Sequence, residues 1–178
     1  YRLCTFSRVC KEKGIEDAVR AVISVNEALG YTAYTLDIYG QVDSSQTDWF
    51  EQLQASFPSY ISYCGLVPFD ESTNVLKHYF ALLFPTYYDG EGFAGTLIDA
   101  FSAGIPVIAS DWKYNPEIVN EHVGCLYPAK DVAALAAVLK DVSHDPSIII
   151  EMKKSCLKES KKYELETVVR DLLNHLKV

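Results

Sequence analysis

The feature that most constrains the fold is the alternation of short apolar runs with helical patterns along most of the chain. The apolar runs predict strands at residues 1–7, 34–39, 60–64, 81–84, 107–109 and 123–127. Apolar positions of helical period predict helices at residues 15–29, 49–57, 73–78, 94–103, 116–120, 131–142, 146–155 and 165–176. Strands that alternate with helices form a parallel sheet with helices on both faces. The sequence therefore predicts a three-layer α/β fold with about six parallel strands.

A binding site is expected at one edge of this sheet. In open parallel sheets, ligands lie beyond the carboxyl ends of the strands, at the point where the strand order reverses. Four loops follow strands at that edge, at residues 8–14, 40–45, 65–69 and 87–96. Three of them carry a glycine close to the strand end, where the backbone can turn with positive φ or approach a ligand closely.

Length and charge limit the class of protein. A chain of 178 residues fits a single domain, 1–178, including C-terminal helices at about 146–177, and it can bury roughly 70% of its unfolded surface. The net charge of −8 argues against a nucleic-acid partner, because binding to a phosphate backbone needs a basic surface, but it permits a nucleotide ligand. Five scattered cysteines favour a reducing, cytoplasmic setting. The first residues already have a strand pattern, so we expect a fragment of a longer protein.

Two acids stand near the start of the helix predicted at 94–103. Glu91 lies in the preceding loop, and Asp99 follows eight positions later on a mostly apolar helix. A carboxylate there should meet hydroxyl or N–H donors, because burying it unpaired is costly. Gly92, Gly95 and Thr96 offer backbone N–H groups to an anion at the positive end of the helix. The alternatives are a structural hydrogen bond for Asp99 and plain exposure for Glu91.

Two cations lie on the loop after the first predicted strand. Arg8 offers a planar fork and Lys13 a point charge, so the two side chains can converge on one diphosphate. The alternative is a solvated basic loop. Their place at the predicted ligand edge favours a binding role. No metal is expected, because no paired acids stand in a D-x-D arrangement.

Several segments together resemble one family, the C-terminal, donor-binding domain of retaining GT-B glycosyltransferases of the group 1 (family 4) class. The resemblance covers nearly the whole chain and is most specific between residues 85 and 119. It implies half of a GT-B fold, which is a Rossmann-like domain. The segments that carry it are S-R-V-C-K-E-K-G at 7–14, Y-C-G-L-V-P at 63–68, P-T-Y-Y-D-G-E-G-F-A-G-T-L-I-D-A at 85–100 and G-I-P-V-I-A-S-D-W-K-Y-N-P-E-I-V at 104–119.

The resemblance implies a role for each matching residue. Arg8 and Lys13 would bind the donor diphosphate, Glu91 would lie beside the donor sugar, and Asp99 would bind the ribose hydroxyls. Arg8, Lys13 and Glu91 are thus the predicted catalytic residues. Backbone groups that meet the sugar and phosphate would come from Phe93, Ala94, Gly95 and Thr96. Residues that flank the base would be Gly65, Leu66 and Val67.

Two positions depart from the family pattern. Asp99 replaces the usual Glu, so its contact with the ribose needs a closer helix or a bridging water. Ala94 replaces a common Gly, which narrows the space beside the donor.

The resemblance implies transfer of a sugar, with retention, from a UDP- or GDP-linked donor that acts as substrate, without a further cofactor. W-K-Y-N-P-E at 112–117 is similar to members that build bacterial surface polysaccharides. We expect the family's N-terminal acceptor domain to be absent from this chain, so that the chain alone should transfer little and any peripheral membrane association would come from that absent half. The alternatives are a non-catalytic nucleotide- or partner-binding module and a GT-B epimerase.

Overall fold

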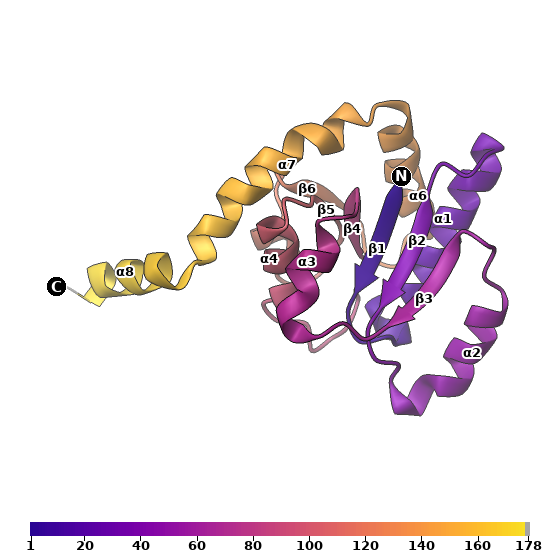
Figure 1. Cartoon of the computed structure of the whole chain (residues 1–178), viewed down its shortest axis with the longest axis horizontal. Coiled ribbons are helices and arrows are strands. Elements are labelled where there is room, and N and C mark those ends of the chain that lie inside the picture. Colours follow the sequence, from indigo (N-terminus) through magenta and orange to yellow (C-terminus); the bar gives the residue numbers. More distant parts are fainter. Residues whose placement is uncertain (177–178) are drawn as a thin grey trace.

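A parallel sheet forms the centre of the molecule. The computed structural model of the protein describes residues 1–176 (Figure 1). Within them the six strands pair only in parallel, in the order β3-β2-β1-β4-β5-β6. The strands are β1 (Arg2–Phe6), β2 (Thr35–Tyr39), β3 (Ile61–Gly65), β4 (Ala81–Phe84), β5 (Val107–Asp111) and β6 (Gly124–Pro128). The predicted three-layer α/β fold is confirmed.

Helices connect the strands and cover the sheet. The α-helices are α1 (Ile15–Leu29), α2 (Thr47–Ala55), α3 (Ser72–Leu76), α4 (Gly95–Ser102), α5 (Asn115–Ile118), α6 (Val132–His144), α7 (Ser147–Ser160) and α8 (Leu165–Leu176). Four 3-10 turns lie at η1 (Lys11–Lys13), η2 (Ser44–Gln46), η3 (Phe69–Glu71) and η4 (Lys161–Tyr163). Helix α7 continues past the predicted end at residue 155, because no glycine or proline interrupts the chain there. Residue 177, the predicted end of the C-terminal helices, lies outside the described residues.

The central strands bury both faces, so successive side chains enter two different cores. Leu83 of β4 packs with α1, α2 and α6 in one core, whereas Leu82 and Phe84 pack with α3, α4 and α7 in the other. The second core does not extend to the edge strand β3, where Ser62 and Cys64 are exposed. This open part of the sheet is the front of the view in Figure 1.

A buried asparagine fixes the connection between α1 and β2. The Asn26 Nδ2 donates to the Tyr34 carbonyl at 2.8 Å, and its Oδ1 accepts the N–H groups of Ala33 and Tyr34, both at 3.0 Å. Helix α1 ends at Gly30, whose φ of 74° suits a glycine. The side chain of Asn26 therefore pairs both backbone groups of Tyr34 and shares the Ala33 N–H with the Tyr31 carbonyl.

We expect Asn26→Ala to lower the free energy of unfolding by about 2–3 kcal/mol, because the buried N–H and carbonyl groups of Tyr34 lose their hydrogen bonds to the side chain, whereas the Ala33 N–H keeps the Tyr31 carbonyl at 3.0 Å. Urea denaturation measures this. Asn74, exposed on α3, is the matched control, and its change to alanine should cost no more than about 0.5 kcal/mol. Equal effects of the two substitutions would contradict the bridging role of Asn26.

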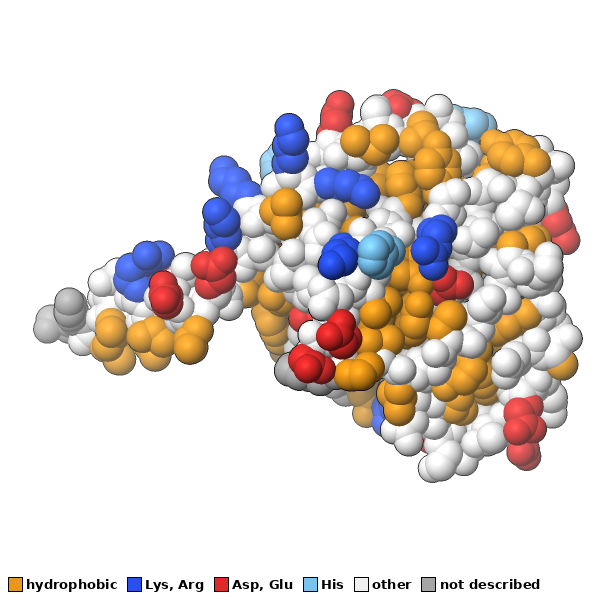
Figure 2. Space-filling model, viewed as in Figure 1, with side chains coloured by type: hydrophobic (Ala, Val, Ile, Leu, Met, Phe, Trp, Pro, Cys, Tyr) orange, Lys and Arg blue, Asp and Glu red, His pale blue; other side chains and the backbone are white. Residues whose placement is uncertain are grey.

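Helix α8 projects from the body of the molecule (Figure 1). It buries no residue, and Figure 2 shows its hydrophobic side chains along one side of the projecting arm. Their exposed fractions lie between 43% and 77%, and they belong to Leu165, Val168, Val169, Leu172, Leu173 and Leu176. Among the helices of residues 1–176, none is long and apolar enough to cross a membrane.

Candidate functional site

Two loops meet where the strand order reverses. Strand β1 leads to α1 on one face of the sheet, and the neighbouring β4 leads to α4 on the other. The Tyr87 N–H donates to the Glu12 carbonyl at 2.8 Å. Gly14 packs so closely on Pro85 that an added Cβ would lie 2.1 Å from the Pro85 carbonyl oxygen. The loops after β1 and β4 therefore form one continuous wall at the carboxyl edge of the sheet.

Lys13 and Glu91 form an ion pair within this wall. The Lys13 Nζ lies 2.9 Å from Oε1 and 2.6 Å from Oε2 of Glu91. Their side chains are 13% and 8% exposed, and the Thr86 hydroxyl donates to Glu91 Oε2 at 2.5 Å. Glu91 is thus not a freely exposed carboxylate. Two predicted site residues are brought together, although the sequence did not predict their direct contact.

Arg8 lies further along the same edge. Its guanidinium is 3.5 Å from Asp43 Oδ2, and its side chain is 47% exposed. A hydrogen bond with Tyr88 is the main cause that raises the pKa of Arg8, and Asp43 adds to it. The Asp43 carboxylate accepts the N–H and hydroxyl of Ser45, and these bonds lower the pKa of Asp43.

The ring of Tyr88 lies close to both cations. The Arg8 Cζ and the Lys13 Nζ each lie 5.2 Å from the centre of this ring. An aromatic face attracts cations, so Tyr88 holds both near one position. The sequence suggested only that Tyr88 could shape the rim of a pocket. Its place beside both cations was missed.

Asp99 projects from α4 toward η3 and α3. The Ser72 hydroxyl donates to Asp99 Oδ2 at 2.9 Å. Asp99 is half-buried and helps to line a cavity of about 650 Å³. Its lining is formed by Phe6, Val67, Pro68, Ser72, Phe93, Gly95, Thr96, Ile98, Asp99 and Tyr163. The expected hydroxyl partner is Ser72, and the carboxylate also faces open space.

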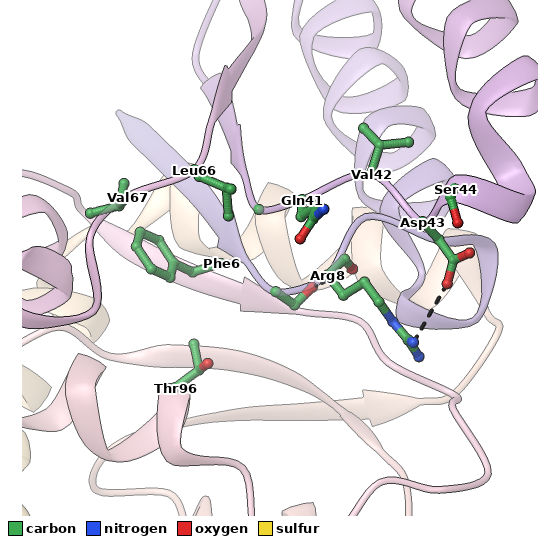
Figure 3. A pocket seen from close by; sticks show the side chains of 11 residues that line it. Phe6, Arg8, Gln41, Val42, Asp43, Ser44, Leu66, Val67 and Thr96 are labelled. Carbon is green, nitrogen blue, oxygen red and sulfur yellow. Dashed lines mark hydrogen bonds and ion pairs between the residues drawn. The ribbon is translucent and has the colours of Figure 1, made fainter.

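A second cavity, of about 500 Å³, adjoins the first (Figure 3). It is lined by Phe6, Ser7, Arg8, Gly40, Gln41, Val42, Asp43, Ser44, Leu66, Val67 and Thr96. Phe6, Val67 and Thr96 belong to both linings, so the two cavities form one groove from Arg8 to Asp99. We call it the switch-point groove. Among the described residues, Lys13 and Glu91 lie in the wall after β1 and β4 and outside this lining.

The start of α4 opens into the groove. Ala94 precedes the helix and caps it without a side-chain hydrogen bond, and Gly95 and Thr96 begin it. The prediction that the helix begins at Ala94 is one residue early. A Cβ added to Gly92 or Gly95 would meet no atom within 4 Å, so space remains there for a ligand. The first N–H groups of a helix lack partners in the helix and suit an anion.

Of the remaining predicted residues, Gly65, Leu66 and Val67 lie across the groove from the start of α4, and Phe93 lies in the loop before that helix. Gly65 ends β3 with a φ of 73°, a left-handed conformation that favours glycine. Leu66 is 68% exposed and lines the groove together with Val67. Phe93 is 61% exposed, and its ring centre lies 5.5 Å from that of Tyr163. These apolar surfaces can receive a flat ring.

In the range 1–176, no group of three or more His, Cys, Asp or Glu side chains is placed to hold a metal ion. The cysteines described there, Cys4, Cys10, Cys64, Cys125 and Cys156, are free thiols.

The comparisons with known proteins agree with this geometry. The family model described as glycosyl transferases group 1 matches residues 1–145. The amylovoran biosynthesis glycosyltransferase AmsK of Erwinia amylovora is 27% identical over 154 residues, which are 84% of this chain and 37% of AmsK. The GtfA subunit of the UDP-N-acetylglucosamine–peptide N-acetylglucosaminyltransferase of Streptococcus pneumoniae is 34% identical over 123 residues, 68% of this chain and 23% of that subunit. The chain thus spans less than half the length of these relatives.

Solved structures share the fold. The C-terminal domain of the glycosyl transferase group 1 family protein LpcC of Francisella tularensis superposes with a TM-score of 0.79 and 21% identity, over 93% of this chain and 87% of that domain. Anabaena HepE in complex with UDP superposes with a TM-score of 0.85 and 16% identity, over 99% of this chain and 48% of HepE.

Proposed function

Because this chain belongs to the glycosyl transferases group 1 family, we propose that it is the half of a glycosyltransferase that binds the sugar donor. The full-length protein would transfer a sugar from a nucleoside diphosphate to an acceptor with retention of configuration. The observation that carries the proposal is the switch-point groove, which joins Arg8, a helix N-terminus and a hydroxyl-bonded carboxylate along one edge of the sheet, beside the wall that holds Lys13.

The groove can take a nucleotide in one orientation. Leu66 and Val67 offer an apolar surface to the base, and Asp99 offers carboxylate oxygens to the ribose hydroxyls. The N–H groups at Gly95 and Thr96 suit the phosphates. Asp99 is one methylene shorter than the family's usual Glu, but Ser72 already holds it at the groove.

Lys13, Arg8 and Glu91 would act at the far end of this nucleotide. The two cations and the N-terminus of α4 would stabilise the charge that develops on the departing diphosphate. Glu91 would hold the Lys13 ammonium in place and face the donor sugar. Within the proposal, these groups neutralise the leaving group without a metal ion.

Relatives and neighbours suggest the donor and the setting. GtfA of pneumococcus was solved with UDP and GlcNAc and HepE with UDP, so UDP is the first nucleotide to test and GDP the second. AmsK acts in amylovoran biosynthesis, which supports a role in polysaccharide or glycoconjugate synthesis. The relatives are longer, and we propose that an N-terminal domain supplies the acceptor site. Free cysteines suit the cytoplasm.

We expect UDP to raise the melting temperature of this chain. At ten times its Kd, UDP should add about 1.4 kcal/mol to the free energy of unfolding, or about 3–5 °C. Asp99→Ala should weaken UDP binding about tenfold, because a charge-assisted hydrogen bond to the ribose is lost. A thermal-shift titration with UDP, GDP and ADP measures both effects.

The matched control is Asp141→Ala, which removes an exposed carboxylate from α6. It should leave UDP binding unchanged. If none of the three nucleotides binds at millimolar concentration, the proposed donor site is wrong. If Asp99→Ala binds UDP as tightly as the control, the ribose assignment is wrong.

A further inference from the structure

The functional residues follow an order along the edge of the sheet. Leu66 and Val67 lie after β3, Arg8 and Lys13 after β1, and Glu91 after β4. Strands β5 and β6 continue the sheet beyond β4. The loops after these strands therefore lie on the side of Glu91, where the proposed donor sugar would be, and away from the proposed base.

These two loops, together with Tyr87 of the loop after β4, carry a cluster of lysines and aromatic rings. The Lys113 Nζ lies 5.4 Å and the Lys130 Nζ 5.7 Å from the centre of the Trp112 ring, and Lys130 also lies 5.0 Å from the Tyr87 ring. We call Tyr87, Trp112, Lys113 and Lys130 the lysine platform. The Trp112 Nε1 donates to the Tyr88 carbonyl at 2.9 Å, which connects the platform to the ring beside Arg8 and Lys13.

The backbone at both lysines is unusual. Lys113 has a φ of 50° and Lys130 a φ of 65°, and they are the non-glycine residues with positive φ in the part of the chain that the structure describes. Glycine, asparagine or aspartate adopts this conformation at lower cost. Strained positions cluster at functional sites. At both positions a lysine stands where another residue type would suit the backbone better.

The lysines of the platform have little direct ion pairing, although the acids Glu12, Glu16 and Asp17 lie near the Tyr87 ring. Within residues 1–176, Lys113 pairs only with Asp89, at 3.8 Å, with side chains 41% and 92% exposed. Such an exposed, long pair is weak, so an incoming anion can replace it. Lys130 is exposed, and no ion pair involves it within residues 1–176. In a chain of net charge −8, two ammonium groups beside one indole ring form a local site for an anion.

We propose that the lysine platform binds the anionic group, a phosphate or a carboxylate, of an acceptor saccharide whose remaining part lies in the acceptor site of the proposed N-terminal domain. The two ammonium groups pair with that group, and the Trp112 ring packs against the apolar face of a sugar ring. The acceptor would then approach from the side of β5 and β6, next to Glu91. This inference rests on the proposed transferase function and adds the chemical class of the acceptor.

Trp112 itself reports the binding. The chain has two tryptophans, so Trp49→Phe leaves Trp112 as the fluorescent one. The Trp49→Phe protein is titrated with glucuronate, glucose 6-phosphate and glucose, with and without saturating UDP. We expect glucuronate or glucose 6-phosphate to change the Trp112 emission with a saturable curve, and glucose to change it far less. A response to glucuronate alone assigns a carboxylate, and one to glucose 6-phosphate alone assigns a phosphate.

Lysine variants test the assignment. Lys113→Gln with Lys130→Gln should weaken binding of the responding sugar about tenfold. Lys140→Gln with Lys158→Gln, at exposed lysines on α6 and α7, should not change it. The platform is contradicted if Trp112 responds to neither anion, if glucose gives an equal response, or if the Lys113 and Lys130 variant binds like the control.

A UDP thermal shift on the same proteins separates this inference from the proposed function. UDP binding without a response of Trp112 contradicts the platform alone. Absence of UDP binding contradicts the donor site, and the titration without UDP then still decides whether the platform binds anions.

Discussion

Lys13→Ala in the full-length protein should lower the rate of sugar transfer by about 10²–10³-fold, because it removes one charge that stabilises the leaving diphosphate. It should also lower the free energy of unfolding by about 3 kcal/mol. The reason is that Glu91, with only 8% of its side chain exposed, loses its cation and remains as a buried charge. Initial rates and urea denaturation measure the two effects.

Two further variants separate folding from catalysis. Lys13→Met with Glu91→Gln replaces the ion pair by neutral side chains of similar size, which should restore most of the stability. The same double variant should stay as inactive as Lys13→Ala, because the charge is still absent. Lys11→Ala, two positions earlier, removes an exposed lysine and should leave both properties near wild type. A stable double variant with normal activity would exclude a role for Lys13 in transfer.

Gly14→Ala should strongly destabilise the contact between the loops after β1 and β4. Gly14 has a φ of 68°, and its new Cβ would lie 2.1 Å from the Pro85 carbonyl oxygen. The left-handed backbone costs about 1 kcal/mol, and the clash adds about 2 kcal/mol or more, since the neighbour is backbone. The melting temperature should therefore fall by about 6–12 °C.

Gly30→Ala is the matched control for this prediction. Gly30 has a similar φ of 74°, but an added Cβ would meet no atom within 4 Å. Gly30→Ala therefore carries only the cost of the left-handed backbone, and it should lower the free energy of unfolding by about 1 kcal/mol. Similar losses for Gly14→Ala and Gly30→Ala would show that the loops after β1 and β4 separate readily.

The sequence was sufficient to predict the layers of the fold, because hydrophobic periodicity reports which faces of strands and helices are buried. It also placed Glu91 in a loop and Asp99 on the following helix. It did not predict that Lys13 contacts Glu91 or that Ser72 donates to Asp99. These contacts depend on β1 lying next to β4 and on the path of the chain before α3. No local pattern encodes either arrangement.

The lysine platform was missed for a different reason. A left-handed residue is normally expected at glycine or asparagine, so Lys113 and Lys130 gave no signal. The rings and charges of the lysine platform come from the loops after three strands, β4, β5 and β6. In the sequence, the segment W-K-Y-N-P-E at 112–117 indicated only a similarity to family members that build bacterial surface polysaccharides. In the structure, the Trp112 ring of this segment lies within 5.7 Å of the ammonium groups of Lys113 and Lys130.

Helix α8 gives the chain a segment whose order depends on its surroundings. It has twelve residues and buries none of them, whereas isolated helices shorter than about 12–15 residues are marginal in water. Its apolar stripe is exposed to solvent (Figure 2). The rate of hydrogen exchange at residues 165–176 should consequently change with the protein concentration and with added apolar surfaces, independently of the stability of the sheet. The amides of this helix thus report association, while those of β1 and β4 report global unfolding.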